Sequence, residues 1–353
     1  MRCVTIRGAP PAAAESAMTE TSTHLRTFVI ANPVAGAGQV KEDWPLLERL
    51  LRANLPEVDF AFTEGPAHAT LLAREALRTG WEMVVAVGGD GTLNEVVNGF
   101  YERPEPTTCY ALDDEGWVLR RDLSLQPINP DAVLGLVPIG TGGDFRRSVG
   151  LMAGAAEAIE RLRGRETRAL DLGQVGFLDA RGNLATRYFV NIASGGISGV
   201  VDAMANSTWK GLGGRASFAV ATMRAFAKWK NIEVEVRLDD TSELRDRVLN
   251  LSVANGEYFG GGMWVAPGAE LDDGRLQLIM MGDLSRPQAL RMFTDIYKGS
   301  HLGHRKVSRH RARQVAVRLV EPSALALVDL DGEQPGKLPA TFNVHHRALQ
   351  FKA

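Results

Sequence analysis

A run of glycines directly after a short apolar segment constrains the fold of this chain more than any other feature. Residues 83–87 read as a buried strand, and Gly88-Gly89-Asp90-Gly91-Thr92 follows at once. Glycines in this position let the backbone turn with positive φ and approach a ligand closely. Thr92 can cap a helix that runs to about Gly99. The free N–H groups at the start of this helix would attract an anion. The segment therefore predicts a phosphate-binding turn rather than a turn that binds nothing.

Two further glycine-rich loops follow apolar segments in the same manner. Residues 28–31 and 134–138 read as buried strands, and they precede residues 32–38 and Gly140-Thr141-Gly142-Gly143. Strands that alternate with helices indicate an α/β domain with a parallel sheet, which binds ligands at the carboxyl ends of its strands. We therefore expect the three loops to meet at one edge. None has Walker A or dinucleotide-fingerprint spacing, so the phosphate cradle is of another kind.

Length and pattern divide the chain into two domains. At 353 residues it is too long for one typical core. Residues 27–165 form the expected α/β nucleotide-binding domain, preceded by a flexible tail (residues 1–26) and with an insertion at its edge (residues 101–131). Alternating segments in residues 166–353 predict a mainly antiparallel β-sandwich domain, interrupted by one helix at residues 217–230. Its last strand is free to return to the first domain.

Composition excludes several classes of function. The apolar fraction of 45% and charged fraction of 23% are those of a globular protein, and the net charge of -2 gives no basic field for nucleic acid. Cys3 and Cys109 form neither a metal spacing nor a disulfide framework, which suits a reducing cytoplasm. No segment reaches the roughly 18 apolar residues of a membrane span, and the N-terminus lacks the apolar region of a signal peptide. We therefore expect a cytoplasmic protein.

The three loops are followed by later motifs in an order typical of one family. These motifs are Asn255-Gly256, Gly260-Gly261-Gly262-Met263, Ala266-Pro267, Asp272-Asp273-Gly274 and Asp331-Gly332-Glu333. From Thr27 onward, nearly the whole chain resembles the diacylglycerol-kinase catalytic superfamily, which also contains sphingosine and ceramide kinases. It resembles the bacterial YegS-like lipid kinases most. The resemblance implies a lipid kinase that transfers the γ-phosphoryl group of ATP to the hydroxyl of diacylglycerol or a related glycerolipid.

The resemblance also implies roles for particular residues. The residues that match nucleotide-binding positions are Asn32, Pro33, Gly36, Thr63, Gly88, Gly89, Asp90, Gly91, Thr92, Asn94, Glu95, Gly140 and Thr141. Asp90 would lie beside the phosphates and help to organise Mg²⁺. Asp331 and Glu333 match an acidic pair, of which one is the general base and the other a phosphate-side or metal residue. The sequence does not say which is which.

A second magnesium site is implied near the middle of the second domain. Asp273, with backbone carbonyls near Glu270 and Arg275, matches a site that has a structural role in the family. Phosphoryl transfer needs in-line positioning, a divalent cation and a carboxylate to take the hydroxyl proton. Oxygen ligands suit magnesium, and no His/Cys cluster indicates a softer metal. Without the resemblance, Asp273-Gly274 and Asp331-Gly332 would each read as an ordinary turn.

The third loop departs from the family pattern. The family has an asparagine after Gly-Thr, giving Gly-Thr-Asn-Asp-Phe, whereas here Gly142 takes that place and Gly143 precedes Asp144-Phe145. Loss of the side-chain amide removes a hydrogen bond near the nucleotide. Either the backbone at the extra glycine replaces that bond, or activity is weaker.

Two other functions stay open at this point. A sphingoid-base or ceramide kinase would use the same machinery with a different lipid pocket. A nucleotide-binding regulatory protein without turnover is the non-enzyme alternative, although the retained Asp90, Asp331 and Glu333 argue against it. An NAD kinase also has a Gly-Gly-Asp-Gly loop, but residues 260–267 and the Asp331-Gly332-Glu333 motif favour the lipid kinases.

The expected partner is a lipid substrate at the membrane surface, which the chain would visit as a peripheral protein. We expect no nucleic-acid partner, and the sequence leaves open whether the chain forms a homodimer. A basic run contains Lys298, Arg305, Lys306, Arg309, Arg311 and Arg313, interleaved with three histidines. It is either a solvated face or a surface that attracts anionic headgroups, at roughly 1 kcal/mol per basic residue.

Overall fold

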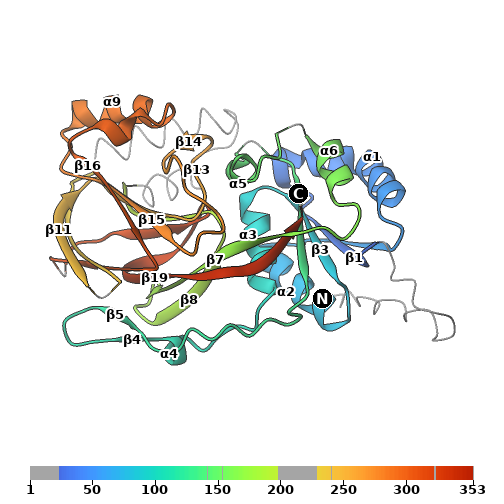
Figure 1. Ribbon diagram of the computed structural model, residues 1–353, viewed down its shortest axis with the longest axis horizontal. Helices are drawn as coiled ribbons and strands as arrows, with labels where there is room; N and C mark the ends of the chain where they lie inside the picture. The colour runs from blue at the N-terminus through green and yellow to red at the C-terminus, as the bar shows by residue number, and fades with distance from the viewer. Residues whose placement is uncertain are drawn as a thin grey trace. The chain divides into compact units, whose positions relative to one another are not determined.

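The computed structural model describes residues 24–140, 142–152, 154–197, 229–239, 241–321 and 323–352. The chain forms two compact units. The first comprises Met1–Arg103, Leu125–Leu170 and Leu349–Ala353, and the second comprises Pro104–Ser124 and Asp171–Ala348. The predicted fold class, an α/β domain with parallel strands followed by a mostly antiparallel β domain, is confirmed (Figure 1).

The first unit is built on a parallel sheet. Its strands are β1 (Thr27–Ala31), β2 (Val58–Phe62), β3 (Met83–Gly88) and β6 (Val133–Pro138). They pair in the order β6-β3-β1-β2, and the last residues of β19 (Glu333–Lys352) pair with β6 in parallel. Every residue of β1, β3 and β6 is buried, which explains why these strands are uninterrupted apolar runs.

Helices cover this sheet. They are η1 (Ala35–Gly38), α1 (Gln39–Asn54), α2 (His68–Arg78), α3 (Asp90–Gly99), α5 (Asp144–Ser148) and α6 (Ala155–Arg161). α1 and α6 pack together on one face, where Leu51 and Ile159 join Val29 and Val85 in one apolar cluster. α2 and α3 pack on each other away from that cluster (Figure 1). The carboxyl ends of β1, β3 and β6 continue into the three glycine-rich loops.

The second unit is mainly antiparallel. Its elements are α4 (Pro106–Cys109), β4 (Tyr110–Leu112), β5 (Val118–Arg120), β7 (Arg168–Leu178), β8 (Leu184–Phe189), β9 (Ile192–Gly196), β10 (Ile232–Leu238), β11 (Ser242–Val248), β12 (Asn250–Ala254), β13 (Tyr258–Phe259), β14 (Met263–Trp264), β15 (Leu276–Met281), α9 (Arg286–Ile296), η3 (Ser300–Gly303), β16 (Val307–Ala312), β17 (Gln314–Leu319), β18 (Leu327–Leu330) and most of β19. The antiparallel pairs include β10 with β11 and β17, and β12 with β9 and β15. The helix predicted at residues 217–230 lies outside the described residues, except for its last two positions.

The insertion predicted at the edge of the first domain is placed differently. Residues 104–124, which include the β4–β5 hairpin, belong to the second unit. Trp117 is 2% exposed, and the guanidinium groups of Arg237 and Arg318 lie 4.1 and 4.7 Å from its ring centroid. The hydroxyl of Tyr110 accepts a hydrogen bond from Asn343 Nδ2 at 3.1 Å. The segment interrupts the first unit along the chain, but it packs with the second unit, where its two aromatic side chains are buried.

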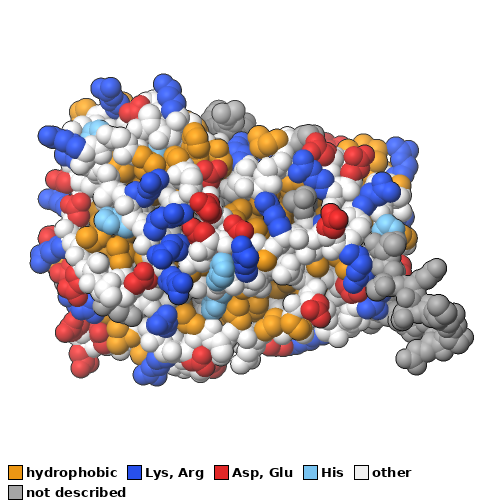
Figure 2. Space-filling view, in the orientation of Figure 1, with side chains coloured by type: hydrophobic (Ala, Val, Ile, Leu, Met, Phe, Trp, Pro, Cys, Tyr) orange, Lys and Arg blue, Asp and Glu red, His pale blue; other side chains and the backbone are white. Residues whose placement is uncertain are grey.

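Charged side chains of both signs intermingle on the face shown in Figure 2, in keeping with the net charge of -2. Part of the basic run lies on β16, where Arg311 pairs with Asp273 at 2.6 Å. Lys306 donates to the backbone oxygen of Asp283 at 2.5 Å. These contacts agree with a solvated face, and attraction to headgroups stays a prediction. Within the described ranges, no helix is both long and apolar enough to cross a bilayer.

Candidate functional site

The glycine-rich turn after β3 packs tightly on the first turn of α3. A Cβ added at Gly88 would lie 2.6 Å from Oγ1 of Thr92, so a side chain would force the turn away from the helix. Thr92 is 6% exposed, and its hydroxyl oxygen accepts a hydrogen bond from Asn32 Nδ2 at 3.0 Å. This bond joins the loops that follow β1 and β3.

Asp90, the first residue of α3, joins the third loop to the same turn. Its carboxylate accepts hydrogen bonds from the backbone N–H groups of Asp144 (3.0 Å) and Phe145 (3.1 Å), which begin α5. A Cβ added at Gly140 would lie 3.7 Å from the Cα of Gly89, so the two loops approach closely. The structure thus brings the three loops together, as their sequences predicted.

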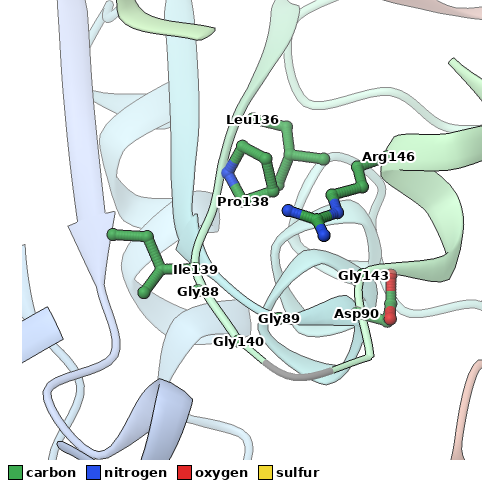
Figure 3. Close-up of a pocket in the computed structure, with 9 residues that line it drawn as sticks. All are labelled: Gly88, Gly89, Asp90, Leu136, Pro138, Ile139, Gly140, Gly143 and Arg146. Carbon is green, nitrogen blue, oxygen red and sulfur yellow. The ribbon is translucent and has the colours of Figure 1, made fainter. Parts of the chain in front are cut away.

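A pocket lies where the second and third loops meet (Figure 3). It is lined by Gly88, Gly89, Asp90, Leu136, Pro138, Ile139, Gly140, Gly143 and Arg146. Because four of these residues are glycines, backbone rather than side chain forms much of the wall. α3 begins at this wall, and the first N–H groups and positive dipole end of a helix favour an anion. The pocket is therefore suited to a phosphate group.

Two residues predicted to hold ATP make hydrogen bonds within this unit. The carboxylate of Glu95 accepts hydrogen bonds from the N–H groups of Ala67 (2.8 Å) and Ala69 (3.1 Å), at the start of α2. Asn94 is 1% exposed, and its side-chain oxygen accepts from Asn98 Nδ2 at 3.1 Å. Neither residue lines the pocket.

The other predicted nucleotide ligands lie in or beside the three loops. Pro33 and Gly36 follow β1, Thr63 follows β2, and Gly91 is in the first turn of α3. A Cβ added at Gly36 would lie 3.4 Å from Ile139, which shows how closely the first and third loops pack. Thr141 lies outside the described residues.

Asp331 lies in the second unit, in the turn between β18 and β19. Its backbone has φ of 50°, in the left-handed region, and its side chain is almost fully buried. The carboxylate accepts hydrogen bonds from the N–H groups of Val190 (3.2 Å), Asn191 (3.2 Å) and Ile192 (2.9 Å). The connection between β8 and β9 therefore fixes the orientation of this carboxylate.

Sequence reasoning missed two residues that accompany this turn. Arg187 donates from Nη1 to Oε2 of Glu333 at 2.9 Å. Asp329 is 2% exposed, and its carboxylate accepts from Ser194 Oγ (3.1 Å) and from the N–H of Gly332 (3.0 Å). The spacing of Asp329 from Asp331 was a usable signal, whereas nothing in the sequence links Arg187 to a partner 146 residues away.

The predicted structural magnesium site lies in the loop between β14 and β15. Asp273 Oδ2 pairs with Arg311 at 2.6 Å, and Oδ1 accepts from the N–H of Arg275 at 2.9 Å. Glu270 lies 3.7 Å from the same guanidinium. Among the residues that the structure describes, no group of three or more His, Cys, Asp or Glu could hold a metal ion. Magnesium requires six oxygen ligands, so Asp273 supplies only part of such a site and the site stays a prediction.

Sequence reasoning also missed Asp171, which anchors this loop. The carboxylate of Asp171 is fully buried and accepts hydrogen bonds from the N–H groups of Gly274 (2.6 Å) and Arg347 (2.7 Å). It also lies 2.9 Å from Nδ1 of His346. A buried carboxylate with these partners holds the loop in a defined conformation.

Two family models match the chain, one in each half. Residues 26–175 match the diacylglycerol kinase catalytic domain, and residues 191–353 match the YegS C-terminal NAD kinase beta sandwich-like domain. The chain belongs to the diacylglycerol kinase catalytic-domain superfamily. The three glycine-rich loops lie in the residues that the first model matches, and Asp331 and Glu333 lie in those that the second model matches.

Similar proteins cover nearly the whole chain. A diacylglycerol kinase of Staphylococcus haemolyticus is 29% identical over 89% of this chain and 84% of its own length. A diacylglycerol kinase of Staphylococcus carnosus is 27% identical over 90% of this chain and 91% of its own length. A crystal structure of a Bacillus anthracis protein proposed to be a diacylglycerol kinase has a TM-score of 0.68 at 22% identity, covering 94% of this chain and 98% of its own. That likeness confirms the fold.

Proposed function

We propose that this chain transfers the γ-phosphoryl group of ATP to the free hydroxyl of diacylglycerol. Its superfamily makes it a lipid kinase, a phosphotransferase with an alcohol acceptor. The observation that carries the proposal is the pocket of backbone and glycine that the second and third loops form beside the start of α3. The diacylglycerol kinases of Staphylococcus that align along the chain support diacylglycerol as the acceptor.

In this proposal the pocket takes the phosphates of ATP. The turn at Gly88 and Gly89 presents backbone N–H groups, and the dipole of α3 adds a favourable field. Asn32 in the first loop donates a hydrogen bond to Thr92, so this loop supports the turn from the side of β1. Positioning and electrostatic stabilisation provide most of the rate increase in phosphoryl transfer, so a rigid cradle of this kind is what the reaction requires.

The reacting groups of the proposal are Asp331 and Glu333. In this proposal one carboxylate takes the proton of the lipid hydroxyl as its oxygen attacks the γ-phosphorus, and the other acts as a phosphate-side or metal residue. Three backbone N–H groups hold Asp331 in one orientation, and Arg187 does the same for Glu333.

Magnesium fits the first unit better than the loop of Asp273. Each carboxylate oxygen of Asp90 accepts one hydrogen bond, which leaves a lone pair on each for a cation. When bound there, Mg²⁺ would neutralise charge on the phosphates. Asp90 would orient it while also holding the third loop.

The proposal extends to where the reaction takes place. Diacylglycerol resides in bilayers, so we propose that the chain meets its substrate at the membrane surface, as a cytoplasmic peripheral protein, whether as a monomer or a homodimer.

The test is transfer of labelled phosphate from ATP with Mg²⁺ to diacylglycerol, monoacylglycerol, phosphatidylglycerol, ceramide and sphingosine in mixed micelles. We expect labelled phosphatidic acid, and at least a 100-fold slower reaction for Asp331→Asn and for Glu333→Gln. Asp114→Ala, an exposed carboxylate in the same unit, is the matched control and should keep full activity. Label on ceramide or sphingosine alone would reassign the substrate, and no labelled lipid would contradict the proposal.

A further inference from the structure

Arg146 places a cationic side chain in the wall of the glycine-rich pocket. It is the third residue of α5, and it lines the pocket together with Gly88, Gly89 and Gly143. Figure 3 shows its guanidinium directed into the space between Pro138 and the backbone of Gly89. No family position or motif assigned a role to this residue.

The Nε of Arg146 is buried and has no hydrogen-bond partner. The neighbouring Arg147 is different, because its Nη1 donates to the backbone oxygens of Gly142 (2.5 Å) and Gly143 (2.9 Å). Arg147 therefore holds the third loop in place, whereas Arg146 presents a donor to the pocket. A buried donor without an acceptor costs about 1–3 kcal/mol, so a ligand that supplied an acceptor to this Nε would be favoured.

Gly143 provides the space that the Arg146 side chain occupies. A Cβ added at Gly143 would lie 2.6 Å from Nε and 2.9 Å from Cδ of Arg146. Gly143 also has φ of 57°, a conformation that favours glycine. The glycine that precedes Asp144-Phe145 is thus coupled to the arginine three residues later. A side chain at position 143 and the present position of Arg146 exclude each other.

We propose that Arg146 binds a phosphate oxygen of the nucleotide in this pocket, in place of the side-chain amide that the third loop lacks. A guanidinium offers several donors in a planar fork that matches phosphate oxygens. The inference rests on the proposed function, because the ligand is the phosphate chain of a nucleoside triphosphate. Arg146 contacts ATP directly in this proposal rather than acting through another side chain.

The test compares the binding of ATP and adenosine to the full chain by titration calorimetry. Arg146→Ala should weaken ATP binding about tenfold or more and leave adenosine binding unchanged, because only ATP carries the phosphates. Arg163→Ala removes an exposed arginine of the same unit and should bind both ligands as the wild type does. Equal ATP affinity for the two variants, or equal loss for ATP and adenosine, would overturn the assignment.

A second substitution tests the coupling without removing the arginine. Gly143→Asn keeps a residue that tolerates positive φ, but its Cβ must displace the Arg146 side chain. We expect Gly143→Asn to weaken ATP binding in the wild-type background and to change ATP affinity less in the Arg146→Ala background. Equal effects in both backgrounds would contradict the coupling. Failure of the wild type to bind ATP would contradict the proposed function itself, whereas normal wild-type binding with an unaffected Arg146→Ala variant would contradict this inference alone.

Discussion

At the scale of single residues, the carboxylate of Asp90 has two roles. Its motif predicts a carboxylate beside phosphates, and the structure shows a carboxylate that accepts the N–H groups of Asp144 and Phe145. These bonds satisfy donors at the start of α5 that have no partner inside the helix. The shape of the third loop therefore depends on the charge at position 90, even before a nucleotide binds.

Asp90→Asn should lower the free energy of unfolding of the first unit by about 1–3 kcal/mol, because an amide nitrogen would face one of the two N–H donors. Urea unfolding at neutral pH measures this change. Asp131→Asn, an exposed carboxylate in the same unit, should differ from the wild type by less than about 0.5 kcal/mol. Unchanged stability of Asp90→Asn would mean that the carboxylate serves only the ligand.

At the scale of elements, Trp117 is one of the two buried aromatic side chains that hold the hairpin of β4 and β5 in the second unit. Trp117 is buried, and its ring contacts the guanidinium groups of Arg237 and Arg318, which lie on β10 and β17. Aromatic burial and cation–π contact both contribute to this packing. The hairpin is thus a fixed part of the second unit rather than a loose insertion.

Replacing Trp117 by alanine should destabilise the second unit by about 3–5 kcal/mol, because the large side chain leaves a cavity. Thermal unfolding would report the loss as a lower melting temperature. Leu119→Ala lies in the same hairpin but is 42% exposed, and it should change stability by no more than about 0.5 kcal/mol. Equal melting temperatures for the two variants would show that the hairpin does not depend on Trp117.

At the scale of the whole molecule, two long strands pass from one unit to the other. β7 begins in the first unit and continues into the second, and β19 returns from the second so that residues 350–352 pair with β6. On β19, His345 is hydrogen-bonded to Gln174 Oε1 of β7 at 2.7 Å. Burial lowers the pKa of His345 to about 4.

The lowered pKa of His345 predicts a pH dependence of stability. The unfolded chain binds a proton at this residue below about pH 6.5, whereas the folded chain does not until about pH 4. The contribution of His345 to stability is therefore fully present above pH 6.5. It is lost as pH drops towards 4, by at most about 1.4 kcal/mol per pH unit. His345→Gln should show a shallower decline in urea unfolding over this range. Parallel pH profiles for wild type and variant would contradict the prediction.

The sequence by itself determined the parallel sheet, the antiparallel second domain and the three loops that meet at one edge. These features follow from local rules, since buried strands read as apolar runs and tight turns require glycine, as at Gly88. The order of the motifs further indicated the family and the pair Asp331 and Glu333.

Only the tertiary structure decided which partners the side chains around the three loops and the Asp331 turn have. Glu95 belongs to the nucleotide motif by sequence, yet it caps α2. Arg187 meets Glu333 across 146 residues of chain, and Arg146 occupies the space that Gly143 leaves. Periodicity and spacing describe neighbours along the chain, whereas these contacts depend on how distant segments pack. That is why the loops could be predicted from the sequence and the partners of their side chains could not.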